Sequence, residues 1–247
     1  MLVAVFVCPG VSMFPNQVFC RICHVKTGYE ERELHIRSEF ARGGVPVHWY
    51  LDHDVADLSA EDRQAALKPA QVSLARKHIG IWREFLNTDL PYCLVFEDDV
   101  FLARNFVARL EDALQELAAG RQAVVYLGNG GNYYTPRSKL TKGRSLYPAN
   151  HSRCTDSYIL TRSAAQARCN WFDRNELNLP IDIAVNDCDK ATGTDILWFE
   201  RPIVEQGTHN GRFTTSIEGG KQRPLWWKRI EWRWKKYRRQ FFGHTAN

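Results

Sequence analysis

One segment near the middle of the chain, residues 93–101, limits the possible folds more than any other. It reads Cys-Leu-Val-Phe-Glu-Asp-Asp-Val-Phe, so an apolar run ends in three consecutive acids and apolar character resumes directly afterwards. Residues 94–96 are β-branched and aromatic enough to form a buried strand, and Pro91 precedes them. The pattern therefore predicts a buried strand that ends at Glu97, Asp98 and Asp99.

Three carboxylates at the end of a buried strand repel one another and are costly to remove from water. A cation would relieve both costs, and Mg²⁺ or Mn²⁺ prefers carboxylate oxygens and often shares them with substrate phosphates. Because open α/β sheets bind ligands at the carboxyl ends of their strands, the segment indicates a metal and diphosphate site. The alternative interpretation is a solvated turn that is merely acidic.

Composition sets broad limits on the rest of the chain. The 247 residues suit one sizeable domain, alone or with an appendage, and 44% apolar with 25% charged residues is ordinary for a soluble globular protein. No run approaches the roughly 18 apolar residues of a membrane span. Residues 1–8 are apolar but lack a basic flank, so we expect a strand or an irregular start rather than a signal peptide, and Met13 is an alternative start.

Cysteine usage and charge give two further indications. Seven cysteines without framework-like spacing favour reduced thiols and a cytosolic location. Cys20 and Cys23 form a Cys-x-x-Cys pair, but without a second pair at zinc-finger spacing they are interpreted as ordinary thiols rather than a metal or redox site. The net charge of +5 is uneven, because residues 221–239 hold nine Lys or Arg and one acid, Glu231. The remainder is mildly acidic.

Hydrophobic periodicity predicts alternating strands and helices. Residues 18–24 are predicted to form a strand, residues 29–42 a helix that ends at Gly43-Gly44, and residues 45–51 a second strand. This βαβ unit predicts parallel strands. Further helices are predicted from Ser59 onward and over residues 73–86, 105–119 and 163–169, and further strands over residues 123–127, 158–160 and 195–199. We expect the last of these to be the final strand.

Two segments between predicted elements have a composition that is typical of loops. Residues 128–132 read Gly-Asn-Gly-Gly-Asn and predict a flexible loop that could approach a ligand closely, although glycine content is equally typical of a surface connection. Residues 133–150 are polar and basic without a clear period, which predicts a mobile lid or acceptor loop.

Six segments occur in an order that is typical of one known family. They are Glu31-Arg32 after the first strand, Lys77-His78-Ile79-Gly80-Ile81-Trp82, Val95-Phe96-Glu97-Asp98-Asp99-Val100, Thr155-Asp156-Ser157-Tyr158-Ile159-Leu160, Pro180-Ile181-Asp182, and Pro202-Ile203-Val204-Glu205-Gln206. With them, the chain resembles glycosyltransferase family 25, which includes bacterial lipooligosaccharide galactosyltransferases and related collagen-modifying enzymes. The resemblance extends from about Val18 to Ile217.

The resemblance implies an α/β fold of the GT-A type, a nucleotide-sugar-binding domain with a mainly parallel central sheet flanked by helices. It also implies a UDP-sugar donor, a Mn²⁺-like ion at the acidic motif, and inversion at the anomeric carbon. We expect this domain to span residues 1–218, followed by a basic amphipathic tail over residues 219–247. Two residues depart from the family pattern: Lys77 stands where Ser is common, and Ile183 replaces the aromatic residue that often follows Asp182.

The acidic motif is the predicted metal and diphosphate site. A divalent cation, Mn²⁺ or Mg²⁺, would stabilise the charge that develops on the leaving nucleoside diphosphate. Glu97 and Asp99 are the predicted metal ligands, with Asp99 the favoured direct ligand, and Glu97 and Asp98 also face the donor. His209 is a further candidate ligand from a late polar loop, where a solvated histidine is the alternative.

Further donor contacts are expected from the loop after the first strand and from the end of the second. The candidates are Lys26, Arg32 and Asp54, with His78 facing the donor from its helix. The ordinary alternative for each is a solvated or ion-paired side chain.

Inversion by direct displacement needs a carboxylate that takes the acceptor hydroxyl's proton on the face opposite the diphosphate. Asp182 is the first candidate for this base and Asp156 the second, with Asp187 and Asp189 less favoured. A helix cap or a surface acid is the alternative for each of them.

The tail has a pattern of its own. In helical register, residues 225–242 place Trp226, Ile230, Trp234, Tyr237 and Phe241 on one stripe, with Lys and Arg over much of the remaining surface. This is typical of an interfacial helix on an anionic membrane, which would make the protein peripheral on the inner face of the cytoplasmic membrane. A helix packed on the domain and, least favoured, a nucleic-acid arm are the alternatives.

The leading hypothesis is a metal-dependent inverting glycosyltransferase that moves a hexose, galactose by the resemblance, from a UDP-sugar to a lipopolysaccharide or other surface-glycan acceptor. A nucleotidyltransferase would use similar carboxylates, but no glycine-rich loop with Arg or Lys follows the first strand. A non-enzymatic module that binds membranes or nucleic acid through the tail would leave the acidic triplet unexplained.

Overall fold

The computed structural model describes residues 12–117 and 120–208, together with residues 230, 234, 237–239 and 241. The strands are β1 (Val18–Cys23), β2 (Trp49–Tyr50), β3 (Tyr92–Glu97), β4 (Val100–Leu102), β5 (Ala123–Tyr126), β6 (Leu146–Ala149), β7 (Ser157–Thr161), β8 (Asp195–Phe199) and β9 (Val204–Gln206). The α-helices within residues 12–208 are α1 (Glu30–Gly43), α2 (Pro69–Leu86), α3 (Phe106–Glu116), α4 (Arg162–Phe172) and α5 (Ile181–Thr192).

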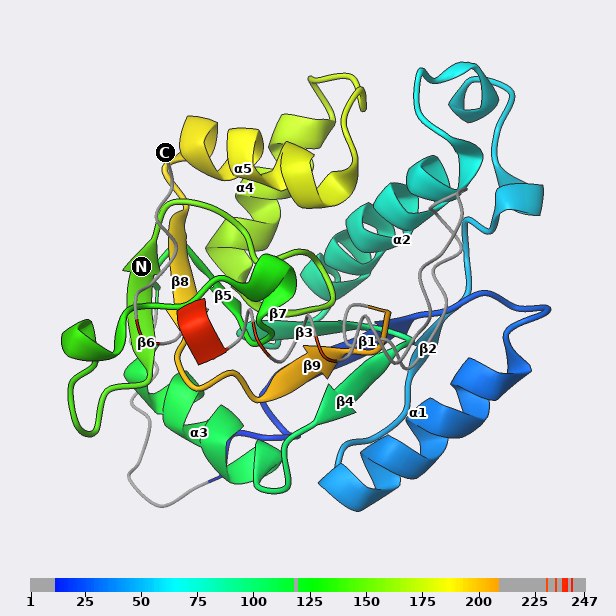
Figure 1. Cartoon of the computed structure of the whole chain (residues 1–247). Coiled ribbons are helices and arrows are strands. Elements are labelled where there is room, and N and C mark those ends of the chain that lie inside the picture. The colour runs from blue at the N-terminus through cyan, green and yellow to red at the C-terminus, as the bar shows by residue number, and fades with distance from the viewer. Residues whose placement is uncertain are drawn as a thin grey trace.

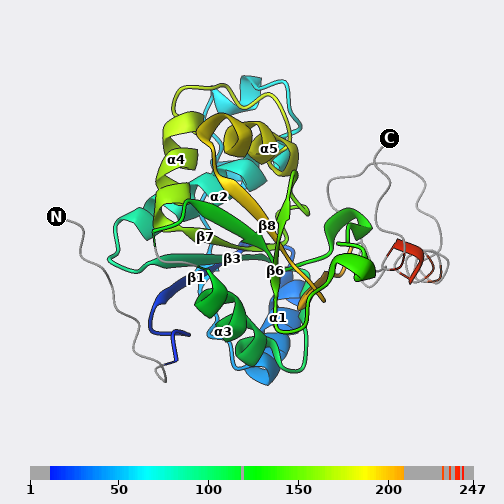
Figure 2. The same ribbon diagram turned by 90° about the vertical axis from the view of Figure 1, so that its left-hand side faces the viewer.

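A seven-stranded sheet in the order β2-β1-β3-β7-β5-β8-β6 forms the centre of the molecule, and β4 pairs with β9 in a separate two-stranded sheet. Helices α1 and α3 cover one face of the large sheet, and α2, α4 and α5 cover the other (Figure 1 and Figure 2). The predicted α/β class, with helices flanking a central sheet, is confirmed.

The large sheet is mixed but mainly parallel. Strands β2, β1, β3, β5 and β8 run in one direction, whereas β7 lies antiparallel between β3 and β5, and β6 is antiparallel at the edge. The predicted βαβ unit is confirmed, because β1 and β2 pair in parallel. An antiparallel strand begins where its parallel neighbours end, so the segments just before β7 and β6 lie at the carboxyl ends of the other strands.

The alternating side chains of β3 connect two hydrophobic cores. Leu94 and Phe96 face the core beneath α1 and α3, whereas Cys93 and Val95 face the core beneath α2, α4 and α5. Successive residues of a strand point to opposite faces of the sheet, so a strand that is buried on both faces must be apolar throughout. This explains the continuous apolar run that precedes the acids, and it fixes Glu97 at the end of a central strand.

Several local predictions are confirmed and others are wrong. Helix α1 ends as predicted, at Gly44 with a left-handed φ of 70°. The helix predicted from Ser59 is wrong: the Ser59 hydroxyl accepts a hydrogen bond from the Asp62 N–H, but only a 3₁₀ turn over Asp62–Gln64 follows. The strand predicted over residues 195–199 forms as β8, but it is not the final strand, because β9 follows it. Strand β6 forms inside the segment 133–150, for which no period was found.

The tail is described only in part. Residues 230, 234, 237–239 and 241 are helical, whereas Trp226 and most of residues 219–247 lie outside the described residues. The stripe residues Ile230, Trp234, Tyr237 and Phe241 are each more than half exposed. Within the described parts of the chain, no helix has the length and apolar character needed to cross a membrane. The six described cysteines are all free thiols.

Candidate active site

A pocket of about 470 Å³ lies at the carboxyl ends of β1, β2 and β3. Five residues predicted to contact the donor line it together, and they are Lys26, Arg32, Asp54, Glu97 and Asp98. The pocket also has an apolar side that includes Tyr29, Val55 and Leu74. A lining that combines charged and apolar groups suits a ligand that carries both phosphates and a flat base.

Each cation of this donor pocket is paired with an acid of the same pocket. The Lys26 ammonium lies 2.8 Å from Asp57, and the Arg32 guanidinium lies 2.6 Å from Asp98. Lys77, which departs from the family pattern, is buried and lies 2.7 Å from Asp54. The lysine at position 77, where the family commonly has serine, therefore supplies an ion-pair partner for Asp54 at the end of β2.

Asp98, the middle acid, has both carboxylate oxygens engaged by the protein. His24 Nδ1 lies 2.8 Å from Oδ2, and Arg32 Nη1 donates to Oδ1 at 2.6 Å. The side chain is buried between the loop after β1 and the start of α1. Asp98 therefore holds the donor pocket together, and its oxygens are less available to an ion than those of its neighbours.

Asp99 is buried and only partly satisfied. The Thr208 N–H donates to Oδ2 at 3.0 Å, whereas Oδ1 has no hydrogen-bond partner among the described residues. Burial, reinforced by the negative charge of Glu97, raises the pKa of Asp99 from 3.8 to about 6. A nearby cation would offset both effects.

Asp156 and Gln206 have unsatisfied oxygens in the same region. Asp156 precedes β7 and is fully buried, and its pKa is raised well above the usual value by burial and then by Glu97 and Asp99. Its Oδ2 accepts a hydrogen bond from Ser157, but Oδ1 has no partner in the described part of the chain. Gln206 ends β9, and its Nε2 donates to Glu97 while its buried Oε1 has no described partner.

Three buried oxygens, Asp99 Oδ1, Asp156 Oδ1 and Gln206 Oε1, thus have no hydrogen-bond donor in the described residues. Hard divalent cations take such oxygens, and Mg²⁺ in particular uses one or two carboxylates together with substrate phosphates. Within residues 12–117 and 120–208, no group of three His, Cys, Asp or Glu side chains is arranged to hold an ion by itself. The donor set fits an ion whose coordination the ligand's phosphates complete.

The remaining predicted metal-ligand and donor-contact residues are two histidines, His209 and His78. His209 lies outside the described residues. His78 is fully buried and does not line the donor pocket; its Nε2 lies 3.7 Å from Glu97 Oε1 instead. Glu97 Oε1 also accepts a hydrogen bond from Thr155 Oγ1 at 2.9 Å, so three segments of the chain converge on this carboxylate.

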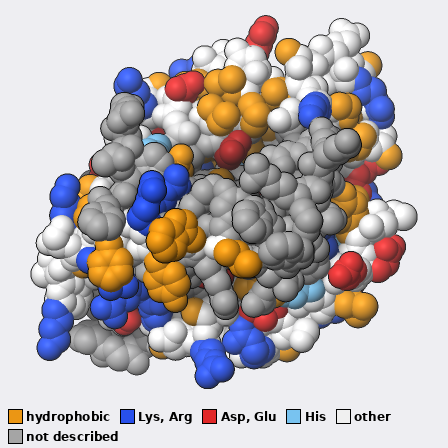
Figure 3. All heavy atoms as spheres, in the orientation of Figure 1, with side chains coloured by type: hydrophobic (Ala, Val, Ile, Leu, Met, Phe, Trp, Pro, Cys, Tyr) orange, Lys and Arg blue, Asp and Glu red, His pale blue; other side chains and the backbone are white. Residues whose placement is uncertain are grey.

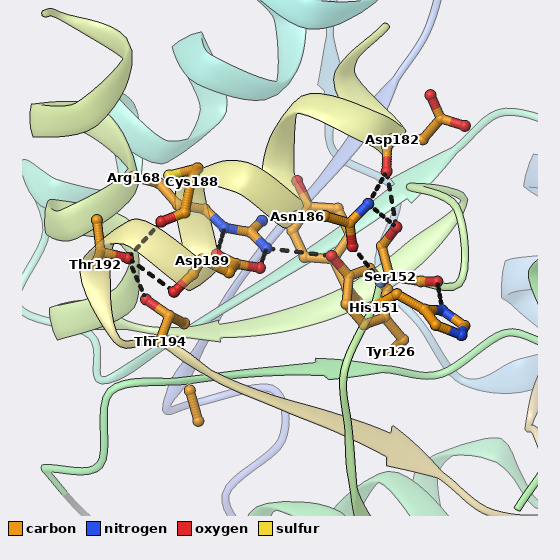
Figure 4. Close-up of polar contacts among 12 residues, drawn as sticks. Tyr126, His151, Ser152, Arg168, Asp182, Asn186, Cys188, Asp189, Thr192 and Thr194 are labelled. Carbon is orange, nitrogen blue, oxygen red and sulfur yellow. Dashed lines mark hydrogen bonds and ion pairs between the residues drawn. The ribbon is translucent and has the colours of Figure 1, made fainter. Parts of the chain in front are cut away.

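Asp182 lies in the first turn of α5 and is half-buried. Its backbone carbonyl accepts hydrogen bonds from Ser152 Oγ and Asn186 Nδ2, and Figure 4 shows its carboxylate pointing away from these partners. Burial raises the pKa of Cys154, and the charges of Asp156, Asp182, Glu97 and Asp99 raise it further. The charges of both candidate bases and of the two predicted metal ligands therefore act on the same thiol.

The two less favoured base candidates lie further along α5. Asp189 is fully buried and forms two hydrogen bonds with Arg168, at 2.8 and 2.6 Å, as drawn in Figure 4. Asp187 is exposed on the outer face of the helix. Asp189 is therefore a structural ion-pair partner, and Asp182 is the acid of this helix whose charge, like those of Glu97 and Asp99, acts on Cys154.

Unusual backbone conformations occur along the same sheet edge. Among the described residues, four that are not glycine have φ between 54° and 65°, and they are His53, Asn132, Cys154 and Arg201. Three of them follow parallel strands and Cys154 precedes antiparallel β7, which places all four at the carboxyl ends of the parallel strands. Such conformations cost about 1 kcal/mol or more and cluster at functional sites.

Basic side chains border the other half of this edge. Arg137, Lys142, Arg144 and Arg201 line two neighbouring pockets of about 870 and 550 Å³ beside β6 and the end of β8. Figure 3 shows Lys and Arg side chains along the left and lower margins of the molecule, the side on which Figure 1 draws β6 and α3. The polar segment predicted to be an acceptor loop contributes three of these cations.

The family of the chain follows from comparison with known proteins. The model of glycosyltransferase family 25, described as an LPS biosynthesis protein family, matches residues 59–185, just over half of the chain. The chain belongs to this family, as its sequence motifs indicated, and the observed sheet and flanking helices are of the GT-A type predicted for it. The matched region contains His78, Glu97, Asp99, Asp156 and Asp182, whereas Gln206 lies beyond it.

Relatives share parts of the chain. A putative glycosyltransferase of Haemophilus influenzae is 25% identical over 186 residues, which cover 70% of this chain and 62% of that protein. The lacto-N-neotetraose biosynthesis glycosyltransferase LgtB of Neisseria meningitidis serogroup B is 35% identical over 99 residues, or 35% of each chain. A solved glycosyltransferase involved in glycosylation of the PBCV-1 major capsid aligns with a TM-score of 0.46 and 6% identity, over 88% of this chain and 98% of that chain. The chain thus spans less than two thirds of the length of these curated relatives.

Proposed function

We propose that this protein is an inverting, metal-dependent glycosyltransferase that transfers a hexose, galactose in the first instance, from a UDP-sugar to a lipopolysaccharide or other surface-glycan acceptor. The observation that carries the proposal is the set of unsatisfied oxygens of Asp99, Asp156 and Gln206, three residues that interact with Glu97 of the donor pocket. Family membership supports the reaction class.

The donor pocket suits a nucleoside diphosphate sugar. Tyr29 offers an aromatic ring for the base, and Val55 and Leu74 extend the apolar side. Lys26 and Arg32 offer cations for the phosphates, and each would exchange part of its contact with Asp57 or Asp98 for a phosphate oxygen. The sugar would then lie toward Glu97.

Mn²⁺ or Mg²⁺ would be held by Asp99, Asp156 and Gln206, with Glu97 at the pocket side. When bound, the ion supplies positive charge that stabilises the leaving diphosphate. The cluster of carboxylates that burial and mutual repulsion destabilise in the protein alone would then become a favourable ion site. His209, one residue after Thr208, stays a candidate for an additional ligand.

Asp182 is the proposed base, in preference to Asp156. A base must ionise and must reach the acceptor hydroxyl. Asp156 is fully buried with a strongly raised pKa, whereas Asp182 is half-buried in the first turn of a helix, where the helix dipole favours a negative charge. Asp182 would take the proton as the hydroxyl oxygen attacks the anomeric carbon from the face opposite the diphosphate.

The acceptor would approach over the half of the sheet edge that contains β5, β8 and β6, because the donor pocket occupies the other half. The exposed stripe of the tail is proposed to contact an anionic membrane surface. Arg137 lies 4.2 Å from the centre of the Phe241 ring, which brings Phe241 beside the predicted acceptor loop. A lipid-linked acceptor would thereby be presented close to Asp182.

A thermal-shift panel of UDP-, GDP-, CMP- and dTDP-sugars, each with and without Mn²⁺, tests the donor and metal together. The largest shift is expected for a UDP-sugar with Mn²⁺, because tight binding to the folded state raises the melting temperature. Equal shifts with and without the metal would refute the ion site, and a preference for another nucleotide would refute the donor class.

The base is tested by Asp182→Asn. Transfer should fall about 10²- to 10⁴-fold while UDP-sugar binding is retained, because the amide cannot accept the proton. Asp187→Asn, an exposed acid of the same helix, is the matched control and should leave transfer unchanged. Near-normal turnover of the Asp182 variant would exclude it as the base.

A further inference from the structure

His78 is a buried histidine whose position is not explained by contact with the donor. It belongs to α2, its side chain is fully buried, and it does not line the donor pocket. Its Nδ1 lies 2.8 Å from the Tyr158 hydroxyl, and its Nε2 lies 3.7 Å from Glu97 Oε1. The imidazole therefore lies between β7 and the acidic end of β3.

The hydrogen bonds of the Tyr158 hydroxyl favour one tautomer of His78. Trp82 Nε1, which can only donate, lies 2.8 Å from the Tyr158 oxygen and supplies one hydrogen bond to it. The single O–H of Tyr158 is then available to donate to His78 Nδ1. A neutral imidazole whose Nδ1 accepts a hydrogen bond carries its proton on Nε2.

Nε2 has no strong acceptor at hydrogen-bond distance. Cys23 Sγ, a weak acceptor, lies 4.0 Å from both ring nitrogens, and Glu97 Oε1 lies 3.7 Å from Nε2, beyond hydrogen-bond length. A buried N–H without a strong acceptor destabilises the folded state. A shift of Glu97 by roughly 1 Å toward the ring would recover this energy with a charge-assisted hydrogen bond.

We propose that Tyr158 and His78 form a positioning relay for Glu97. Tyr158 holds His78 as the Nε2–H tautomer, and His78 donates to Glu97 Oε1, which Thr155 also anchors at 2.9 Å. With Oε1 held by Thr155 and His78, the oxygen presented to the ion and diphosphate is Oε2, which accepts one long hydrogen bond, from Gln206 Nε2 at 3.3 Å. The role of the relay in ligand binding rests on the proposed function, whereas the tautomer does not.

The tautomer is tested directly by ¹⁵N NMR of the imidazole rings in the full chain, with the His78 signals assigned by their loss in His78→Gln. The expected spectrum has a protonated Nε2 and an unprotonated Nδ1, and Tyr158→Phe should abolish this preference. A proton on Nδ1, alone or together with one on Nε2, would overturn the proposal. The measurement requires neither metal nor activity, so it decides the tautomer even if the proposed function fails.

The positioning role is tested with Mn²⁺ alone and then with Mn²⁺ and UDP. Tyr158→Phe should weaken Mn²⁺ binding about tenfold or more, as loss of an outer-shell partner of a metal ligand does. Tyr126→Phe is the matched control, because Tyr126 pairs with Tyr158 across the sheet, is equally buried, and contacts Arg168 instead of His78. Equal losses in the two variants would show a merely structural effect and would overturn the proposal.

A variant pair isolates the route through Glu97. If His78 acts on the ion through Glu97, Tyr158→Phe should cause no further loss of Mn²⁺ affinity in a Glu97→Gln background. Additive losses would overturn the relay. Should Mn²⁺ fail to bind the unsubstituted protein, the proposed function is refuted, and so is the relay's role in ligand binding.

Discussion

Two groups of buried charged side chains lie beside the same sheet and differ in how their charges are balanced. Arg168 and Asp189 are both fully buried, and two hydrogen bonds join the guanidinium to the carboxylate. Asp99 and Asp156 are equally buried, yet they lie among other acids and each has an oxygen without a described partner. The first pair is electrically complete, and the second group is not.

This difference distinguishes an ion pair with a structural role from a candidate ligand site. A buried ion pair balances its own charge and needs no ligand to do so, although Arg168 Nη1 has no hydrogen-bond partner among the described residues. Buried acids that repel one another and whose hydrogen bonds are incomplete destabilise the protein alone, and a fold retains such a cost where a ligand compensates it. Burial of a charge is therefore not itself evidence of a site, whereas an unbalanced charge with unsatisfied oxygens is.

The largest effect is expected from breaking the complete pair. Asp189→Ala leaves the Arg168 cation buried without its partner, which should lower the free energy of unfolding by about 3–5 kcal/mol in urea denaturation. Asp195→Ala, which removes the partner of Arg121 from an ion pair at the surface, should cost under about 1 kcal/mol. A small loss for Asp189→Ala would mean that the pair is not the structural element inferred here.

A stabilising effect is expected from the incomplete group. The folded-state pKa of Asp99, about 6, exceeds the usual 3.8, so the folded state binds more protons and stability falls as pH rises through this interval. Without divalent metal and at about pH 8, Asp99→Asn should therefore raise the free energy of unfolding by about 2–3 kcal/mol. The measurement is denaturation in EDTA from about pH 4 to 8, where the variant should show a smaller decline with pH.

Mn²⁺ should reverse the difference in stability between the unsubstituted protein and Asp99→Asn. The metal should stabilise the unsubstituted protein and leave Asp99→Asn almost unchanged, because a neutral amide is a poorer ligand than a carboxylate. An Asp99→Asn variant that is less stable than the unsubstituted protein in EDTA would contradict the interpretation of Asp99 as an uncompensated charge.

A smaller effect is expected from displacing Asp156 without changing its chemistry. A Cβ at Gly128 would lie 2.3 Å from Asp156 Oδ2, so Gly128→Ala must move the carboxylate. Mn²⁺ binding should weaken about tenfold, or about 1.4 kcal/mol, in a titration of the folded protein. Gly43→Ala is the control, because its Cβ would meet only the flexible end of Leu102. Unchanged Mn²⁺ affinity in Gly128→Ala would remove Asp156 from the ion site.

Local patterns were sufficient to predict part of this architecture. The apolar run and acids of β3, the glycine end of α1 and the ordered family motifs each depend on residues close together in sequence. They predicted the α/β class and the parallel βαβ unit, which the structure confirms, and five residues that line one pocket, whose contact with a donor stays a prediction. Asp98 is different, because its partners His24 and Arg32 lie 74 and 66 residues away, and no local pattern reveals which of three adjacent acids they engage.

The contributions of Gln206 and His78 could not be predicted for related reasons. Gln206 is brought to Glu97 by the pairing of β9 with β4, a contact between residues 109 positions apart in a strand that periodicity did not reveal. His78 was correctly placed on a helix. However, α2 buries polar residues such as Ser73 and Lys77 as well as apolar ones, so its pattern does not show which face meets the donor.

The contact of residues 206–208 with the acidic motif has a consequence for biosynthesis. Asp99 receives hydrogen bonds from the N–H groups of Gly207 and Thr208, and Glu97 receives one from Gln206. A ribosome that has made the acids of β3 must add more than 100 further residues before these donors emerge. Until then the nascent domain carries its most repulsive segment without these donors, so stable folding of the site awaits nearly the whole domain.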